Sequence, residues 1–328
     1  MFEIEDVDDV TFAPNIKVIG VGGAGSAILW RLVEDNITGV NLVAINTNQR
    51  TIADLQRLGA EIVDIGGDLT KGLGAGGDPN IGENAALQNE ATLQDVIRNT
   101  DLVFITAGLG GGVGSGATPV IAKIAKDLGV LSIGVVTLPF TFEGRRRMKI
   151  ARMAIEKMKD YFDALIVIEN DSLMKLETSR KMSVEDAFKA SDGILRQGIR
   201  LISDLVLVSG TINIDFADLK TILRQSPKSD AILGIGESTE GKAVDAVKNA
   251  IKSPLLSRDL KGAKGIILNI IGYKDMTMED VNDIAEYIRK LSHPDLNLIF
   301  GLNLQQNEDK VIRIMLIATD FAESEIKS

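Results

Sequence analysis

Residues Ala107 to Thr118 read AGLGGGVGSGAT, with five glycines among the seven residues from Gly110 to Gly116. The stretch follows the apolar run at Leu102–Ile105 and precedes an amphipathic run, which predicts a strand, a loop and the start of a helix. Glycines let a loop turn several backbone N–H groups to one point, and a helix N-terminus attracts anions. The stretch therefore predicts a phosphate-binding loop, with a flexible surface loop as the alternative. It contains no lysine, so it is not a Walker-type loop.

Length and composition indicate a globular protein with two domains. The chain has 328 residues, of which 45% are hydrophobic and 25% are charged. The net charge of −10 argues against a general nucleic-acid surface, so no nucleic-acid partner is expected. The absence of cysteine excludes disulfides and thiolate sites, and the single His293 gives little for metal or acid–base chemistry. No metal-ligating residues are therefore assigned.

The first residues, MFEIEDVDDV, are acidic and lack a secretory pattern. No apolar run approaches the roughly 18 residues that a membrane span requires. We therefore expect a soluble cytoplasmic protein without direct membrane insertion.

Two further glycine-rich segments are also expected at the strand ends. Residues 20–25, GVGGAG, come after a predicted strand at 15–19 and fit the dinucleotide fingerprint G-x-G-x-x-G. The next predicted strand, 41–45, ends in Asn46-Thr47-Asn48, where a dinucleotide enzyme usually has an acid. This counts against a nicotinamide-dependent oxidoreductase, an alternative that depends on GVGGAG alone. Residues 72–79, GLGAGGDP, precede a helix predicted at 83–97, so three glycine segments face the same strand ends.

Alternating strands and helices predict a parallel, doubly wound α/β sheet with its ligand at the carboxyl ends of the strands. Further strands are predicted at 131–137 and 165–168, with a helix at 145–161 between them. From Ser183 one long helix follows, with an apolar face that consists of Val184, Phe188, Ser191, Leu195, Ile199, Ile202 and Val206.

Beyond this helix the pattern predicts a second, smaller α/β domain. Its strands are expected at 232–235, 265–271, 296–301 and 311–319, and its helices at 241–251 and 278–291. We therefore divide the chain into a flexible acidic N-terminus (1–14), a nucleotide-binding domain (15–182), a central helix and connection (183–210), a C-terminal domain (211–320) and a short tail (321–328).

Several side chains near the predicted strand ends suit a nucleotide. Glu143 follows the strand at 131–137 and could accept from ribose hydroxyls, with Arg147 in reach of the sugar or a phosphate. Asn170 could read a base edge, Phe188 could stack on a base, and Asp192 could accept from guanine N–H groups. The alternatives are a turn at Asn170, a core position for Phe188 and a solvated helix position for Asp192.

A group to polarise an attacking water is not obvious, because the glycine segments carry no acid beyond Asp78 and no histidine. Asp215 and Asp218 lie three residues apart at a predicted helix start, which is typical of a capping pair. If they act on a nucleotide instead, it must be that of a neighbouring molecule. Such a head-to-tail contact is heterologous and generates filaments.

Seven motifs occur in the order found in the tubulin/FtsZ family, and they resemble its FtsZ branch most. They are GVGGAGS, KGLGAGGDP, GLGGGVGSG, VVTLPFTFEGRRR, END, DAFKASD and INIDFADLK, and the similarity extends from about Asn15 to Thr319. The sequences TLPFTFEG and GIGES resemble those of archaeal members more closely. The resemblance implies a tubulin/FtsZ-like fold and a cell-division GTPase that binds GTP or GDP with Mg²⁺ and assembles head to tail with itself. It also implies a cytoplasmic location, including the division site, and division-protein or membrane adaptors as further partners.

The resemblance also implies the roles of individual residues. Glu143 and Arg147 would lie at the ribose, and Asn170, Phe188 and Asp192 around guanine. The remaining nucleotide-binding positions would be Gly22, Gly23, Ala24, Gly25, Ala75, Gly76, Gly108, Gly110, Gly111, Gly112, Val113, Gly114, Ser115 and Pro139. The C-terminal domain would be the activation domain, whose first loop would enter the next subunit's site. There Asp215 and Asp218, with Asn213, would promote hydrolysis.

The sequence departs from the family pattern at several positions. Val113 and Ser115 occupy two positions that are usually threonine, and valine lacks the hydroxyl donor. Ala27 and Asn48 stand where asparagine and aspartate are usual, and Gly193 replaces a polar residue. The printed sequence also lacks the family's linker and C-terminal peptide, which puts docking to a membrane adaptor through that peptide in doubt. These departures predict reduced GTP affinity and turnover, with a nucleotide-binding scaffold of weak or no hydrolysis as the alternative.

Overall fold

The computed structural model describes residues 14–57, 59–174, 183–207, 210–226, 230–253, 256, 258–306 and 309–321. The segments predicted as a flexible N-terminus and a short tail fall almost entirely outside these residues.

The first half of the chain forms the parallel part of a ten-stranded sheet, in the spatial order β3-β2-β1-β4-β5-β6. Val21 pairs with Ile45 on one side and with Ala107 on the other, so the carboxyl ends of three neighbouring strands are level. The order reverses between β1 and β4, and ligands of doubly wound sheets bind outside the strand ends at such a point. The six strands are β1 (Ile16–Val21), β2 (Val40–Asn46), β3 (Glu61–Asp64), β4 (Leu102–Gly108), β5 (Leu131–Leu138) and β6 (Ala164–Glu169).

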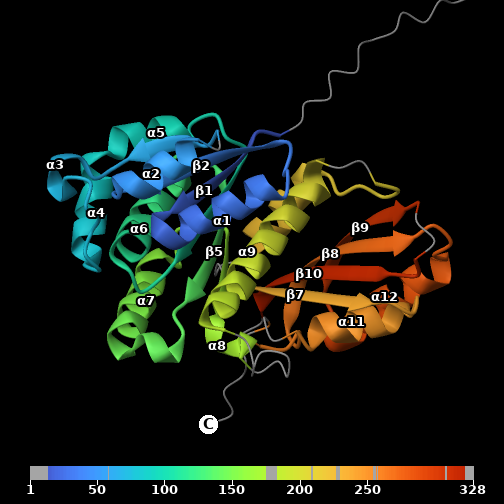
Figure 1. Ribbon diagram of the computed structural model, residues 1–328. Coiled ribbons are helices and arrows are strands. Elements are labelled where there is room, and N and C mark those ends of the chain that lie inside the picture. The colour runs from blue at the N-terminus through green and yellow to red at the C-terminus, as the bar shows by residue number, and fades with distance from the viewer. Residues whose placement is uncertain are drawn as a thin grey trace, which may run out of the picture.

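The second half continues the same sheet with mixed strand directions. β10 (Ile312–Phe321) runs antiparallel to both β7 (Asp230–Ser238) and β8 (Ala263–Tyr273), while β9 (Asn297–Gln305) is parallel to β8. Within the described part of the chain, two residue pairs join β7 to β6. Helices α11 (Ala243–Ile251) and α12 (Met278–Leu291) lie together along one face (Figure 1). The predicted fold class is thus confirmed, while the exact domain boundaries stay a prediction.

The helices predicted in the first half are present, but α8 begins at Asn170, where only a turn had been considered, and there are two further differences. The helix expected at 83–97 is divided at Asn89, whose side-chain amide donates to the carbonyl oxygens of Ala85 and Ile65. The segment after β2 was left without a predicted element and contains α2, β3 and α3. The helices are α1 (Gly22–Glu34), α2 (Gln49–Gln56), α3 (Gly67–Thr70), α4 (Pro79–Gln88), α5 (Glu90–Ile97), α6 (Gly112–Asp127), α7 (Arg145–Met158) and α8 (Asn170–Leu173).

The glycine-rich stretch after β4 is mostly helix, which corrects the expectation of a long loop. Because α6 begins at Gly112, the loop comprises only residues 109–111. The helical glycines allow close packing: a Cβ on Gly116 would lie 2.0 Å from the carbonyl oxygen of Pro79 in α4. A Cβ on Gly114 would lie 2.5 Å from the carbonyl oxygen of Gly108. Only Gly110 in this stretch has a left-handed backbone, with φ of 100°.

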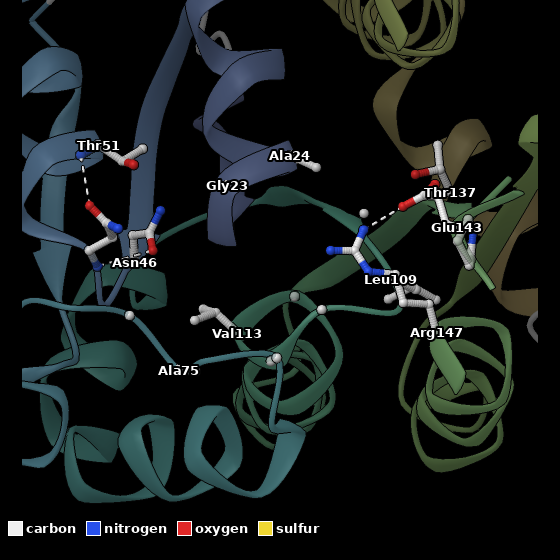
Figure 2. A pocket seen from close by; sticks show the side chains of 18 of the residues that line it. Gly23, Ala24, Asn46, Thr51, Ala75, Leu109, Val113, Thr137, Glu143 and Arg147 are labelled. Atoms are coloured by element: carbon white, nitrogen blue, oxygen red, sulfur yellow. Dashed lines mark hydrogen bonds and ion pairs between the residues drawn. The ribbon is translucent and has the colours of Figure 1, made fainter. Parts of the chain in front are cut away.

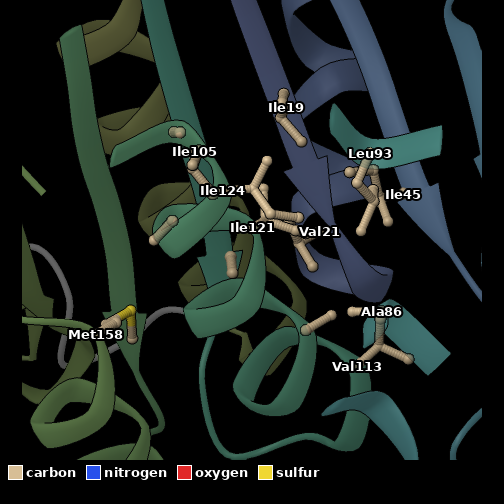
Figure 3. Close-up of a cluster of buried hydrophobic side chains, with 14 of the residues drawn as sticks. Ile19, Val21, Ile45, Ala86, Leu93, Ile105, Val113, Ile121, Ile124 and Met158 are labelled. Atoms are coloured by element: carbon tan, nitrogen blue, oxygen red, sulfur yellow. The ribbon is translucent and has the colours of Figure 1, made fainter. Parts of the chain in front are cut away.

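A buried cluster holds α6 against the sheet (Figure 3). Ile19 and Ile45 on the strands pack with Ile121 and Ile124 on α6, and all four side chains are at most 4% exposed. Burial of this kind stabilises by about 1.5–3 kcal/mol per large side chain, so the direction of α6 is well determined. Its N-terminus consequently points to the carboxyl edge of the sheet.

The predicted long helix is α9 (Val184–Leu207), which lies between the two halves of the sheet (Figure 1). The Ser183 hydroxyl accepts from the backbone N–H of Asp186, so the predicted start is confirmed. Leu195 and Ile199 are at most 1% exposed, whereas Val184 is 61% exposed and lies outside the core. At 1.5 Å per residue, the helix spans about 36 Å. Among the described residues, none of the helices combines the length and the apolar character needed to cross a bilayer.

We expect Gly116→Ala to lower the free energy of unfolding by about 1–3 kcal/mol, because the new Cβ would overlap the backbone of α4. Urea denaturation of the nucleotide-free protein measures this. Gly193→Ala is the matched control, since nothing lies within 4 Å of a Cβ there and the change should stabilise α9 by about 0.5–1 kcal/mol. Equal effects of both substitutions would contradict the packing argument.

Candidate functional site

A cleft of about 540 Å³ lies at the carboxyl ends of the parallel strands (Figure 2). Its walls come from all three glycine-rich segments, represented by Gly23, Gly76 and Gly111, and from the beginning of α9. Its volume is in the range of ordinary small-molecule sites. The prediction that the three segments meet at one edge of the sheet is confirmed.

One end of the cleft is built for an anion. Helices α1 and α6 both begin there, and neither has a side chain that caps its first turn. By contrast, α2 and α4 are capped by Asn48 and Asp78. Uncapped first turns leave backbone N–H groups without partners, and two positive dipole ends at one place favour a negatively charged ligand.

The wall after β5 carries an ion pair. The Glu143 carboxylate accepts from the backbone N–H of Phe140 at 2.9 Å and from Arg147, which lies one helical turn further on (Figure 2). The Glu143 side chain is 11% exposed and that of Arg147 is 57% exposed. Glu143 is thus held in place, while Arg147 can reach into the cleft.

The opposite end of the cleft combines an aromatic ring with polar groups. Phe188 is 38% exposed and packs edge-on against Phe140, with ring centroids 5.2 Å apart. The buried Ser191 hydroxyl donates to the side-chain oxygen of Asn170 at 2.6 Å. A partly exposed ring beside fixed polar groups suits a heteroaromatic base.

Asp192 is the second acid in the cleft wall. Its Oδ2 accepts from Arg31 Nε at 3.1 Å, and the two side chains are 15% and 25% exposed. Burial raises the pKa of the Asp192 carboxyl, and the charge and hydrogen bond of Arg31 oppose that rise.

Comparison with known proteins connects this cleft to a family. The model of the "Tubulin/FtsZ family, GTPase domain" matches residues 15–178, and that of the "FtsZ family, C-terminal domain" matches residues 229–322. The chain belongs to the tubulin/FtsZ family. Together the two matches cover both halves of the sheet, so membership does not depend on the glycine motifs alone.

Solved structures of family members are similar over nearly the whole chain. FtsZ of M. jannaschii, solved as an empty dimer, is 39% identical with a TM-score of 0.86, and the match covers 93% of this chain and 88% of that one. A tryptophan-to-tyrosine mutant of M. jannaschii FtsZ is 38% identical with a TM-score of 0.87, covering 94% and 91%. CetZ2 of Haloferax volcanii, solved as a GTPγS-bound protofilament, has a TM-score of 0.77 at 24% identity. The match covers 95% of this chain and 94% of that one, and at this identity it shows a common fold only.

Most residues that the family resemblance marked as nucleotide-binding line the cleft. Those that do so are Gly23, Ala24, Ala75, Gly76, Gly108, Gly111, Gly112, Val113, Gly114, Pro139, Glu143, Arg147, Asn170, Phe188 and Asp192. Gly22, Gly25 and Gly110 do not line it. Gly25 instead packs α1 on the sheet, where a Cβ would lie 2.7 Å from the carbonyl oxygen of Thr106.

Ser115 also lies away from the cleft. Its hydroxyl is buried and accepts from the backbone N–H of Gly110 at 2.8 Å. Since α6 begins at Gly112, residues 113 and 115 are about 200° apart around the helix, so Val113 faces the cleft and Ser115 faces away. Ser115 therefore braces the loop, a role that the tubulin/FtsZ pattern did not suggest.

Sequence reasoning missed several residues of the cleft wall. One group follows β2, where three consecutive polar residues were noted only for the acid they lack. Ser191 was assigned to the apolar face of α9, and the rest lie within the predicted glycine segments or at the end of a predicted strand. The residues missed are Asn46, Thr47, Asn48, Thr51, Leu73, Gly74, Gly77, Leu109, Thr137 and Ser191.

The other departures from the family pattern have local explanations. Asn48 caps α2, and its side-chain oxygen accepts from the backbone N–H groups of Arg50 and Thr51. Val113 lines the cleft and is 8% exposed, so its methyl groups stand where a hydroxyl is usual. Ala27 lies in an adjoining hollow instead of the cleft.

The candidate catalytic residues lie apart from this cleft. Asp215 caps α10 (Phe216–Gln225) by accepting from the backbone N–H of Ala217, as the capping alternative predicted. Asn213 accepts from the backbone N–H of Gly210 at 2.6 Å. Asp218 is exposed, and its side chain has no partner among the described residues. These residues follow the far end of α9, whereas the cleft contacts its beginning.

The cleft offers magnesium no free carboxylate within the described part of the chain. Its two acids, Glu143 and Asp192, are each paired with an arginine. Across the described residues, no group of three or more His, Cys, Asp or Glu side chains could hold a metal ion. Mg²⁺ commonly binds through substrate phosphates and water, and this cleft fits only that mode.

We expect Ser115→Ala to lower the free energy of unfolding of the nucleotide-free protein by about 1–3 kcal/mol, because it leaves the buried N–H of Gly110 without an acceptor. Ser203→Ala is the control, since that buried hydroxyl donates only to Ile199 within its own helix and its loss should cost less than about 1 kcal/mol. A Ser115→Ala protein of unchanged stability would show that the hydroxyl does not brace the loop.

Proposed function

We propose that this protein is an FtsZ-like GTPase that binds GTP in the cleft, assembles head to tail and hydrolyses GTP where two subunits meet. The observation that carries the proposal is the pair of uncapped helix N-termini, those of α1 and α6, in the wall of a cleft that Asn170, Phe188 and Asp192 also line. The match to the family's GTPase domain supports the same ligand class.

In this proposal the three glycine segments hold the phosphates. Glu143 and Arg147 take the ribose, and Phe188 stacks on the base. The Asp192 carboxylate accepts from the N1–H and the exocyclic amine of guanine, while the amide of Asn170 contacts another edge. Adenine has no N–H at N1, so a carboxylate there favours guanine.

Hydrolysis requires a second subunit because each subunit's own acids are engaged or distant. Both carboxylates of the cleft are paired with arginines, whereas Asp215 and Asp218 are exposed beyond the other end of α9. With a helix of about 36 Å between them, one subunit's acids reach only a neighbour's cleft. Asp218 then orients the attacking water, Asp215 supports it, and Asn213 shapes the loop that carries them.

A head-to-tail contact of this kind repeats without closure and produces a filament. The solved dimer of M. jannaschii FtsZ and the GTPγS-bound protofilament of Haloferax volcanii CetZ2 support self-association and a guanine nucleotide. The higher identity to FtsZ supports a role in cell division, with the filament in the cytoplasm at the division site. Adaptors that tether it there would be additional partners.

We expect Asp218→Ala to retain GTP-dependent assembly, seen by light scattering, while phosphate release falls by about 100-fold or more. Glu279→Ala is the control, because Glu279 is also an exposed acid in the first turn of a helix and should leave turnover unchanged. Full turnover by Asp218→Ala would contradict the shared site.

A mixture of two inactive variants tests the shared site more directly. Asp218→Ala keeps its cleft, and Asp192→Ala keeps its acid pair while losing guanine recognition. If the site is shared, the mixture hydrolyses GTP faster than the sum of its components, and if hydrolysis occurs within one subunit, it does not.

Val113 favours the alternative function, a nucleotide-binding scaffold with little hydrolysis. We expect Val113→Thr to increase turnover about tenfold, since the free energy of a hydrogen bond to a charged group corresponds to about a tenfold change in rate. The measurement is the rate of GTP hydrolysis per subunit as protein concentration is raised. If GTP binds but neither protein hydrolyses it at any concentration, the scaffold is the better description.

A further inference from the structure

We propose that Arg31 is a positioning residue for nucleobase selection, which holds the Asp192 carboxylate toward the cleft from behind. This inference rests on the proposed function, because it takes Asp192 as the group that reads guanine. It assigns the discrimination between purine bases to a contact between α1 and α9.

The placement of the two side chains supports this role. Asp192 lines the cleft, whereas Arg31 does not and lines an adjoining hollow of about 490 Å³. The Arg31 Nε lies 3.1 Å from Asp192 Oδ2. The guanidinium therefore contacts the carboxylate from the adjoining hollow and is not part of the cleft wall. An ionised carboxylate has about four acceptor positions, so one bond to Arg31 leaves acceptors free for a base.

The other charged groups of the hollow already have partners. Glu34 accepts from the Trp30 indole N–H at 2.8 Å, and Lys189 pairs with Glu185 at 2.6 Å. Asp54 lies 3.7 Å from Arg57. Arg31 is thus directed to Asp192 and is not shared among several acids.

The charge of Arg31 affects the pKa of the Asp192 carboxyl. Burial favours the neutral form of Asp192 by raising its pKa, and Arg31 provides the charge and hydrogen bond that oppose this. A neutral carboxyl has lost acceptor capacity and donates a proton instead, which does not match the two N–H donors of guanine. Without Arg31, the pKa of the Asp192 carboxyl would rise further, and the carboxylate would lack the hydrogen bond that orients it.

A second arginine on the same helix pair provides a matched control. Arg196 on α9 pairs with Asp35, which follows α1, at 2.9 Å, and the two side chains are 29% and 26% exposed. This ion pair joins the same two segments at nearly the same burial, but neither residue lines the cleft. Arg31 and Arg196 should therefore contribute alike to packing and differently to base recognition.

The test is equilibrium titration with fluorescent GTP and ATP analogues, at protein concentrations too low for assembly. We expect Arg31→Met to weaken GTP binding about tenfold or more and to change ATP binding by less than about twofold, because only guanine donates to the carboxylate. Arg31→Lys keeps a cationic donor and should restore the GTP preference to within about threefold of wild type. Arg196→Met should leave the preference unchanged.

The outcomes separate this inference from the proposed function. A wild-type protein that prefers GTP, with the same preference in Arg31→Met, overturns the role of Arg31 alone. Loss of the preference in Arg196→Met as well overturns it too, since the effect would then belong to helix packing. A wild-type protein without any preference for GTP overturns the proposed function and this inference with it.

Discussion

Contact of backbone against backbone, without room for a Cβ atom, is the constraint on which the cleft depends. A Cβ on Gly82 of α4 would lie 2.3 Å from the carbonyl oxygen of Gly112 in α6, and one on Gly20 would lie 2.5 Å from that of Gly25. These contacts draw α4 onto α6 and α1 onto β1, so that three separate segments of chain surround one space. Glycine costs conformational entropy on folding, and the buried apolar cluster beneath α6 offsets that cost.

The cleft also shows where local helix stabilisation is absent. Asn48, Asp78, Asp215 and Thr277 each cap a helix, whereas α1 and α6, like α5, α7 and α11, begin without such a side chain. A capping oxygen contributes about 1 kcal/mol to a helix, and it would occupy the N–H groups that an anion needs. What distinguishes α1 and α6 from the other helices without a capping side chain is that glycines of their first turns lie in the cleft wall, which fits a binding role.

Helix α9 connects the two functions proposed for the molecule while keeping them apart. Its first turns present Phe188, Ser191 and Asp192 to the cleft, and its last turn leads to the loop before α10. Under the proposed function, this rigid element of about 36 Å leaves each subunit complete for binding and incomplete for hydrolysis. Under the proposed function, nucleotide turnover is thereby tied to assembly, and Arg31 ties base recognition to the packing of α1 on this helix.

The sequence by itself determined the strands of the parallel sheet other than β3, the three glycine segments at its edge, the start of α9 and most of the cleft wall. These follow from patterns within short stretches of chain, such as apolar runs, glycine clusters and a capping serine. Only the tertiary structure decided that α6 begins at Gly112, that Ser115 turns from the cleft, and that Asn89 divides a helix. It alone also brought Arg31 to Asp192, 161 residues away. Helix phase and long-range partners depend on how elements pack, and local periodicity carries no information about which distant side chain completes a contact.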